Sequence, residues 1–205
     1  MNPLTYVDLE TTGLDANQHE ILEIAILKPT ECMPQGMYCD QPVRGWSSFV
    51  SKVCPVRIET AHPKALEVNR YSAEEWKNAP FLSQLLPLFR PLLEDALIVG
   101  HNVWLDCEFL SAVFRQCGME PPCWKYRVDT ATLIWEHLGS LGHPSLSLES
   151  ACEIVGIDNT GSHRALADVL RTKALVEALT NASLEDRLKW KKRITELQQR
   201  QAEIS

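Results

Sequence analysis

Long apolar runs are missing from this chain of 205 residues. Its longest hydrophobic stretches fall far short of the ~20 residues that a membrane helix needs, so we expect no membrane-spanning segment. The first residues also lack a basic segment followed by an apolar core, and we therefore expect no secretion. The chain is expected to be cytoplasmic.

Zinc-type cysteine spacing is also missing. The chain has 7 cysteines, an odd number, and no two of them are separated by only two to four residues. Cys32, Cys39 and Cys54 could form a zinc site together with His62, but free thiols in a reducing compartment are the better reading of this spacing.

An excess of positive charge is lacking too. Lysine and arginine number 20 against 27 aspartates and glutamates, which gives a net charge of −7. This balance argues mildly against tight, non-specific binding to duplex nucleic acid. With 45% hydrophobic and 23% charged residues, the composition is that of a globular protein, and the length fits one domain with a possible appendage.

Four carboxylates and one histidine, far apart in the chain, can be read as a single metal site. Asp8 and Glu10 lie in Val-Asp-Leu-Glu-Thr-Thr-Gly, Asp106 follows a His-Asn pair, and His163 and Asp168 are the ends of His-Arg-Ala-Leu-Ala-Asp. Two carboxylates about 4 Å apart repel by roughly 4 kcal/mol at an effective dielectric constant near 20. A cluster of four therefore needs cations between them, and ligands that are all oxygen suit Mg²⁺ or Mn²⁺.

The first pair of acids has strand spacing. Side chains alternate faces along a strand, so Asp8 and Glu10 project the same way, roughly 6.6 Å apart along the chain. Taken alone, two exposed residues at a sheet edge would explain them equally well. Asp106 has an alternative reading as well, because an acid in the first turn of a helix is favoured by the helix dipole.

The last pair needs a particular helix start. Five helical steps leave His163 and Asp168 roughly 140° apart, so two residues inside a helix would not converge. They converge if His163 lies in the loop or first turn and Asp168 lies well inside the helix. The alternatives are a capping or solvent-facing His163, and an ion pair of Asp168 with Arg164 or Arg171.

These motifs resemble the three exonuclease motifs of the DnaQ-like DEDDh family. Asp-x-Glu-Thr-Thr-Gly-Leu, His-Asn-(x)3-Asp and His-(x)4-Asp occur here in the family's order. The family consists of metal-dependent 3′→5′ exonucleases on a ribonuclease H-like fold. By resemblance, Asp8, Glu10 and Asp168 hold the metal that activates a water. Asp8 and Asp106 hold a second metal that stabilises the leaving 3′ oxygen, and His163 takes the proton from the attacking water.

The resemblance also implies contacts with the terminal nucleotide. Thr11, Thr12 and Leu14 match family positions that bind it, with Leu14 wedged against the base. His101 and Asn102 follow a buried strand and could touch a ribose or a phosphate.

One position departs from the family's pattern. The family usually has an aromatic residue immediately before the mid-chain aspartate, whereas here Leu105 stands in that place and Trp104 comes one residue earlier.

The sequence thus predicts a 3′→5′ exonuclease that uses two Mg²⁺ or Mn²⁺ ions. It would act on the 3′ ends of nucleic acid, preferably single-stranded and with DNA slightly favoured over RNA, and would release nucleoside 5′-monophosphates. One alternative is a catalytically weak nucleic-acid-binding or proofreading-type subunit on the same fold. Others are an RNA-directed exoribonuclease and a phosphodiesterase for small molecules.

The expected fold class is α/β, a mixed five-stranded sheet formed by an antiparallel meander and then a βαβ unit, flanked by helices. An extended loop is expected at 28–45, and Ser72 should cap a helix in a capping box with Glu75. Pro87 should kink or interrupt its helix. Strands are expected at 4–9, 20–27, 46–50, 96–99 and 126–128, and further helices at 81–89, 105–116, 131–138, 146–155 and from 161–162 to 179.

The last residues differ from the rest. Leu184, Leu188, Ile194 and Leu197 form an imperfect apolar stripe around a basic centre at 189–193. We expect an exonuclease domain at 1–180 and an amphipathic helical extension at 181–205. This extension could dock on the domain, form a homodimer or bind a protein partner, or act as a basic arm for the substrate strand.

Overall fold

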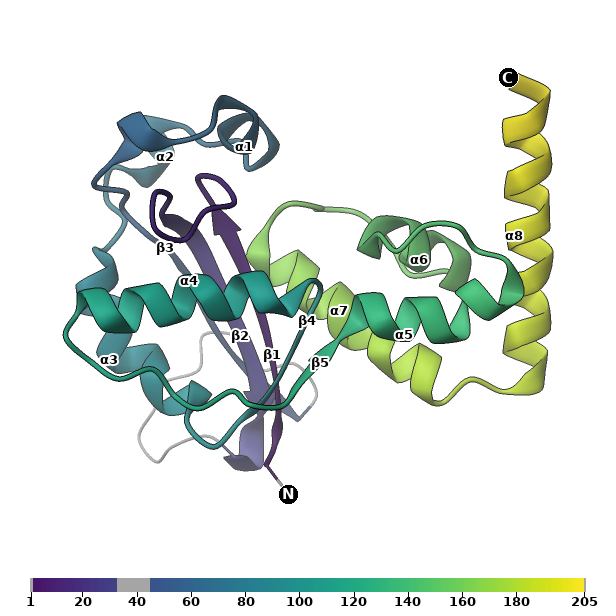
Figure 1. The fold of residues 1–205 in the computed structure, drawn as a ribbon, viewed down its shortest axis with the longest axis horizontal. Coiled ribbons are helices and arrows are strands. Elements are labelled where there is room, and N and C mark those ends of the chain that lie inside the picture. Colours follow the sequence, from purple (N-terminus) through teal and green to yellow (C-terminus); the bar gives the residue numbers. More distant parts are fainter. Residues whose placement is uncertain (1, 33–44, 205) are drawn as a thin grey trace.

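A mixed sheet lies at the centre of the computed structural model, which describes residues 2–32 and 45–204 (Figure 1). Its five strands have the order β3-β2-β1-β4-β5, with β1, β2 and β3 antiparallel and β1, β4 and β5 parallel. The meander followed by a βαβ unit is therefore confirmed. The strands are β1 (Leu4–Thr11), β2 (Ile21–Pro29), β3 (Trp46–Lys52), β4 (Leu97–Gly100) and β5 (Arg127–Asp129).

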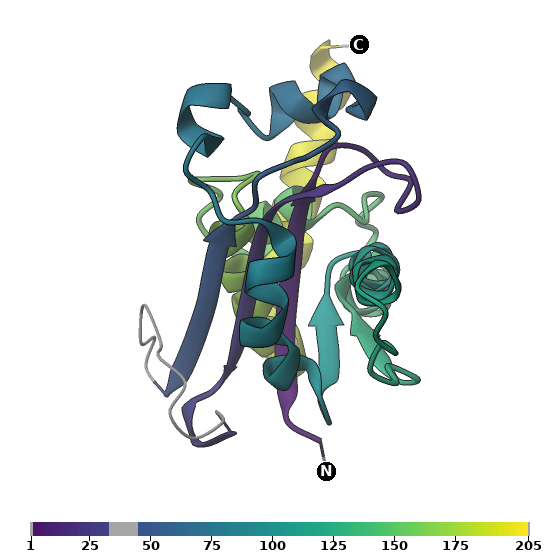
Figure 2. The same ribbon diagram turned by 90° about the vertical axis from the view of Figure 1, so that its left-hand side faces the viewer.

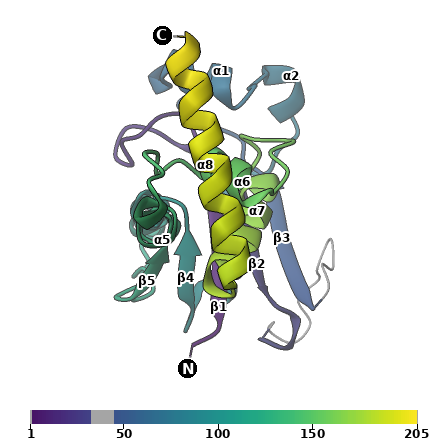
Figure 3. The same ribbon diagram turned by 90° about the vertical axis from the view of Figure 1, so that its right-hand side faces the viewer.

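Helices cover both faces of the sheet. Helices α3 and α4 pack on one face and α7 on the other, while α5, α6 and α8 lie farther out beside α7 (Figures 1 and 3). Figure 2 shows α3 across the sheet and the short α1 and α2 above the end of β1. The helices are α1 (Pro63–Val68), α2 (Ala73–Trp76), α3 (Leu82–Leu93), α4 (Val103–Gln116), α5 (Thr130–His137), α6 (Leu148–Val155), α7 (Ala165–Thr180) and α8 (Leu184–Ile204), with 3-10 turns at Thr30–Cys32, Ile58–Thr60 and Gly139–Leu141.

The alternation along β1 decides where the acids point. Val7 belongs to the core cluster shared with α3 and α4, whereas Tyr6 belongs to the cluster shared with α7. Because side chains two residues apart share a face, Asp8 and Glu10 lie on the side of Tyr6 and of α7. The central strands are covered on both faces, which is why β2 is apolar almost throughout.

Helix α3 is longer than the sequence predicts. It continues through Pro87 and Pro91 to Leu93, so Pro87 does not interrupt the helix, which was one of the two effects predicted for it. Pro87 is exposed and Pro91 half-buried, while the opposite face buries Phe89 and several leucines in the core. Burial of that face outweighs the roughly 3 kcal/mol that a proline inside a helix costs.

The capping box at Ser72 and the loop at 28–45 each differ in part from the prediction. The Ser72 hydroxyl accepts the Glu75 N–H, as a helix cap does, but the Glu75 carboxylate pairs with Lys52 at 2.8 Å instead of completing the capping box. The predicted loop at 28–45 begins later than expected, since β2 runs to Pro29 and a 3-10 turn follows. The rest of that loop lies outside the described residues.

Helix α8 is docked on the chain through only the second half of the predicted stripe, Ile194 and Leu197, together with Trp190. Trp190 and Ile194 are buried against α6, whereas Leu184 and Leu188 are 75% and 60% exposed. The Arg193 guanidinium also donates to the Ile154 carbonyl at 2.8 Å. The buried face therefore centres on the tryptophan inside the basic segment. No helix in the described ranges has the length and apolarity to span a bilayer.

Truncating Trp190 is expected to destabilise the protein. Trp190→Ala removes a large side chain that is 5% exposed, and the free energy of unfolding should fall by about 3–5 kcal/mol. Leu188→Ala on the exposed side of the same helix should change it by no more than about 0.5 kcal/mol. Urea unfolding measures both, and equal stabilities would contradict the docking of α8.

Candidate active site

Three carboxylates meet at the end of β1. Asp8 and Glu10 project from the strand, and Asp168 reaches them from the first turn of α7. Each of the three offers an oxygen atom, and these atoms all lie within 4.8 Å of one another. Glu10 and Asp168 are each only 8% exposed. The sheet and the helix that packs on it thus bring together acids that are up to 160 positions apart in the sequence.

The fourth predicted acid joins this cluster through the backbone. Pairing between β1 and β4 ends at Tyr6 and Val99, so β1 continues alone on that side. Helix α4 begins there, and the Asp106 carboxylate accepts the Leu9 N–H at 3.0 Å. Asp106 is not one of the three acids within 4.8 Å of one another, but it is fixed between Asp8 and Glu10 along the strand.

The cluster is electrostatically strained in the absence of cations. Burial, followed by the charges of Asp168 and Glu23, raises the pKa of Glu10 to about 8. Burial and the neighbouring carboxylates, led by Asp106, raise the pKa of Asp8 well above its ordinary value. Burial also raises the pKa of Asp106, against the lowering effect of the Leu9 N–H. These shifts reflect too much buried negative charge with too little positive charge nearby.

A divalent cation fits this site. The donors are all carboxylate oxygens, which Mg²⁺ and Mn²⁺ prefer, and their spacing lets one ion contact several of them. The raised pKa of Glu10 also indicates a missing counter-charge. Asp8, Glu10 and Asp168 are the residues that would hold the ion, with Asp106 adjacent.

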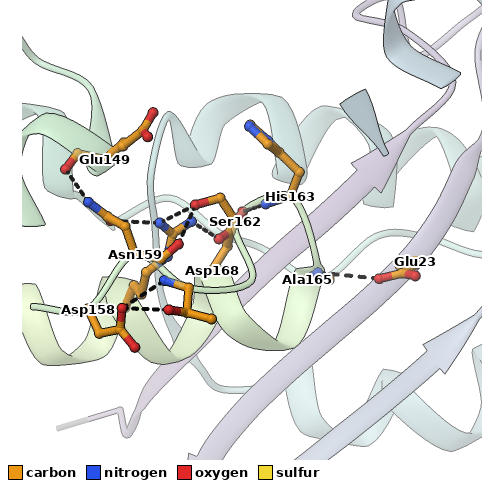
Figure 4. Close-up of polar contacts among 10 residues, drawn as sticks. Glu23, Glu149, Asp158, Asn159, Ser162, His163, Ala165 and Asp168 are labelled. Atoms are coloured by element: carbon orange, nitrogen blue, oxygen red, sulfur yellow. Dashed lines mark hydrogen bonds and ion pairs between the residues drawn. The ribbon is translucent and has the colours of Figure 1, made fainter. Parts of the chain in front are cut away.

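His163 lies in the loop before α7 and not in the helix. Its backbone adopts a left-handed conformation with a φ of 64°, and its N–H donates to Asp168 Oδ2 at 3.1 Å. The sequence argument placed Asp168 well inside the helix. Helix α7 begins at Ala165, however, so Asp168 lies in its first turn. The His163 ring is exposed and turned away from the Asp168 carboxylate (Figure 4). The structure therefore brings the His163 backbone, but not its imidazole, to the acids.

The two arginines proposed as alternative partners of Asp168 behave differently. Arg171 pairs with Asp168 Oδ1, whereas Arg164 pairs with Glu23 at 2.9 Å. The ion-pair reading of Asp168 thus holds for Arg171, and it coexists with the acid cluster. Glu23, which the sequence reasoning missed, lies opposite Glu10 in the register of β1 and β2. A lone carboxylate within the apolar run of β2 was the available signal.

The threonines after Glu10 are engaged within the chain. The Thr11 hydroxyl donates to the Gly13 carbonyl at 2.7 Å. Thr12 is fully buried, and its hydroxyl accepts the Glu20 N–H at 2.8 Å. The Thr12 side chain therefore shapes the turn and is closed to a substrate, whereas Leu14 is 77% exposed.

A cavity of about 680 Å³ opens beside Glu10 and Leu14. One wall is α1, which the sequence reasoning did not predict. This helix is fastened to the end of β1 because Asn69 Nδ2 donates to the Thr11 carbonyl at 2.8 Å. Leu105, in the place of the family's aromatic residue, also faces the cavity. Its lining comprises Leu9, Glu10, Thr11, Gly13, Leu14, Asp15, His19, His62, Lys64, Ala65, Val68, Asn69 and Leu105.

His101 and Asn102 have structural partners next to the site. The His101 Nδ1 lies 2.8 Å from the Thr130 hydroxyl, and burial lowers the pKa of this imidazole. Asn102 has a left-handed backbone, and its N–H donates to Asp129 Oδ1 at 3.1 Å. The same oxygen accepts the Ala131 N–H, so Asp129 caps α5.

The metal-free protein is expected to lose stability as the pH rises from about 4.5 to about 8. In this window the folded state holds a proton on Glu10 that the unfolded state releases, so unfolding becomes more favourable with rising pH. A pKa shift of this size corresponds to at most about 5 kcal/mol. Saturating Mn²⁺ should reverse the trend, because the ion binds the ionised carboxylate.

Thermal unfolding in EDTA and in Mn²⁺, followed by circular dichroism at half-unit steps of pH, measures this effect. Glu10→Gln should flatten the slope in EDTA, since the glutamine has no proton to release. A melting temperature that rises through the window in EDTA would contradict the electrostatic reading of the cluster.

Comparison with known proteins agrees with this geometry. The exonuclease family model RNase T matches residues 5–176. Ribonuclease T of Blochmanniella pennsylvanica is 32% identical over 198 residues, covering 91% of this chain and 84% of its own. The chloroplastic and mitochondrial exonuclease DPD1 of Arabidopsis thaliana is 29% identical over 187 residues, covering 84% of this chain. This chain spans 54% of the plant protein and 11% of a PolC-type DNA polymerase III of Thermotoga maritima that is 30% identical.

Solved structures extend the likeness to the fold. A zinc-bound complex of E. coli exonuclease I with single-stranded DNA superposes with a TM-score of 0.69 at 19% identity, covering 91% of this chain and 42% of that one. With the family match over most of its length and the predicted ribonuclease H-like sheet in place, this chain belongs to the DnaQ-like exonuclease family.

Proposed function

We propose that this chain is a 3′→5′ exonuclease that depends on two Mg²⁺ or Mn²⁺ ions. The observation that carries the proposal is the acid cluster of Asp8, Glu10 and Asp168, next to Asp106, at the edge of an open cavity. Asp8, Glu10 and Asp168 would hold one ion, and Asp8 and Asp106 the other. Bound ions would supply the positive charge that favours attack on a phosphodiester and stabilises the leaving oxygen.

His163 is the proposed general base. A ring nitrogen of His163 takes the proton from the attacking water, after the exposed imidazole has turned toward the acids. The exposure of its side chain supports this role, because an exposed side chain changes rotamer on a fast timescale without displacing the core. Its backbone hydrogen bond to Asp168 keeps the ring within reach of the site.

The cavity beside Glu10 is the proposed site of the 3′-terminal nucleotide. Leu14 and Leu105 offer apolar surface to a base, while Glu10 faces the same space. An unpaired end fits a pocket that takes one base at a time, and the product would be a nucleoside 5′-monophosphate. The names of the relatives include both PolC-type DNA polymerase III and ribonuclease T. A slight preference for DNA over RNA is part of the proposal.

Labelled oligonucleotides test this function. A 3′-labelled single strand should release labelled mononucleotide at once, a 5′-labelled strand should shorten gradually, and EDTA should stop both reactions. DNA and RNA versions of the same strands determine the sugar preference. Binding without hydrolysis would favour the alternative of a catalytically weak subunit, and hydrolysis of small phosphodiesters alone would favour a phosphodiesterase.

Leu14→Ala is expected to weaken substrate binding more than turnover. Loss of the apolar surface against the terminal base should raise KM about 10-fold, since burying a leucine side chain contributes about 1.5–3 kcal/mol. Leu146→Ala, at another exposed leucine before α6, is the matched control and should leave KM unchanged. Steady-state kinetics on a short single strand measure both variants. An unchanged KM for Leu14→Ala would contradict the proposal that the terminal base binds in this cavity.

The domain boundary and the location of the protein are also proposals. An exonuclease domain at 1–180 is supported by the family match to residue 176 and by the end of α7 at Thr180, with 181–205 as a helical extension. The free thiols of Cys54, Cys107 and Cys152 are compatible with a reducing compartment such as the cytoplasm.

A further inference from the structure

One buried arginine connects the acid cluster to the loop that carries the proposed base. Arg171 is 7% exposed, and a charge so deeply buried needs partners on its hydrogen-bond donors. Its Nη2 pairs with Asp168 Oδ1, and its Nη1 donates to Asn159 Oδ1 and to Ser162 Oγ, each of these last two at 2.8 Å. A single guanidinium thus contacts a proposed metal ligand on one side and the loop before α7 on the other.

These contacts hold the backbone on both sides of His163. Arg171 contacts Ser162 immediately before His163 and Asp168 five residues after it. The backbone N–H of His163 closes this set of contacts by donating to the other oxygen of Asp168. Each oxygen of this carboxylate therefore accepts one hydrogen bond, which fixes its plane and leaves its remaining lone pairs for a cation.

The loop has a conformation that needs such support. Gly161 has a φ of 81° and His163 a φ of 64°, so two residues in the left-handed region lie within three positions. The left-handed region is disfavoured for a residue with a side chain such as His163 and persists only where neighbouring contacts hold it. The Ser162 hydroxyl donates to the Asn159 carbonyl, and Asn159 Nδ2 donates to the Glu149 carbonyl at 3.0 Å. The loop is thereby held by α6 on its outer side and by Arg171 on its inner side.

We propose that Arg171 is a positioning residue, which holds the Asp168 carboxylate and the loop carrying His163 as one unit. This inference rests on the proposed function, in which Asp168 is a metal ligand and His163 is the base. The planar fork of arginine suits the task, because two nitrogens with fixed directions serve partners on two sides. A lysine at this position would keep the charge but lose the fork.

The first test measures the loop without reference to catalysis. In metal-free, full-length protein, Arg171→Lys should speed amide hydrogen exchange at His163 at least 10-fold, as the N–H loses its fixed acceptor. Lys173→Gln breaks another ion pair of α7, to Glu177, and should leave that exchange rate unchanged. An unchanged rate in Arg171→Lys would overturn the proposal even if the protein proved to have no nuclease activity.

The second test asks whether the effect passes through His163. Asn159→Ala removes one loop contact of Arg171 but leaves its pair with Asp168, so kcat should fall about 10-fold while KM and the Kd for Mn²⁺ stay within about 2-fold. In a His163→Ala background the same substitution should change kcat by less than 2-fold, because the positioned group is gone. An equal loss in both backgrounds, or no loss in either, would overturn the proposal.

Failure of the proposed function would look different. A His163→Ala variant as active as the wild type would show that His163 is not the general base. An Asp168→Asn variant with normal Mn²⁺ affinity would show that Asp168 is not a metal ligand. Neither result depends on Arg171, and the exchange rate at His163 would still decide whether Arg171 holds the loop.

Discussion

Asp8→Asn is expected to abolish exonuclease activity and, at the same time, to raise the melting temperature of the metal-free protein. Asp8 would contribute to both proposed metal sites, so its loss should lower kcat at least about 10³-fold, more than the 10–100-fold typical of residues that merely support a ligand. The same carboxylate has a raised pKa because it is buried among other acids. Removing its charge relieves that repulsion, and at pH 8 the melting temperature in EDTA should rise by about 5 °C.

The opposite signs of these two effects separate lost chemistry from lost folding. Oligonucleotide hydrolysis, Mn²⁺ titration and thermal unfolding are measured on the same preparation. Glu120→Gln removes an exposed carboxylate beyond the far end of α4 and should change none of them. An active Asp8→Asn enzyme would contradict a mechanism that depends on the metal centre. A lower melting temperature of this variant in EDTA would contradict the inferred repulsion among the buried carboxylates.

His163→Ala is expected to lower kcat about 10²–10⁴-fold while leaving the Kd for Mn²⁺ within about 2-fold. The loss is the usual contribution of a positioned general base. Metal affinity should persist because the His163 ring makes no hydrogen bond in the part of the chain that the structure describes, and the bond to Asp168 comes from its backbone. Alanine keeps that backbone donor.

The pH profile gives this variant a second signature. Wild-type kcat at saturating metal should fall on the acid side of neutrality, because only a neutral imidazole can take a proton. His163→Ala should lack that acid limb. His137→Gln, at the C-terminal end of α5, is the control and should keep the wild-type profile. A wild-type profile that stays flat from about pH 5 to about pH 8 would argue against a histidine base.

The sequence predicts the strands of the sheet and the pairing of Asp8 with Glu10 well because both depend on short-range rules. Alternation along β1 places Asp8 and Glu10 on one face whatever the rest of the chain does. The apolar run of β2 and the glycine after α6 likewise specify their elements locally. Asp168 joins the pair because α7 packs on that same face, which follows from the order of strands and helices.

The remaining features depend on contacts between distant segments. Helical spacing gives Asp168 two possible arginine partners, Arg164 and Arg171. Only the folded structure shows that Arg164 pairs instead with Glu23, which lies on β2. Helix α3 passes two prolines because its far side is buried, and a sequence window does not show which side that is. The docked face of α8 was assigned only in part for the same reason, since Ile194 packs in the cluster with α6 as predicted, but Trp190 is buried there while Leu188 is exposed.

The dual role of Asp129 links two helices mechanically. One oxygen of this carboxylate accepts N–H groups at the starts of both α4 and α5. A shift of either helix start would therefore lengthen a hydrogen bond to the oxygen that the two starts share. Asp106 lies one turn into α4, so a displacement of α5 would be transmitted to the carboxylate that anchors the free edge of β1. The position of Asp106 beside β1 is in this sense supported from outside the cluster, by a carboxylate that is not one of its four acids.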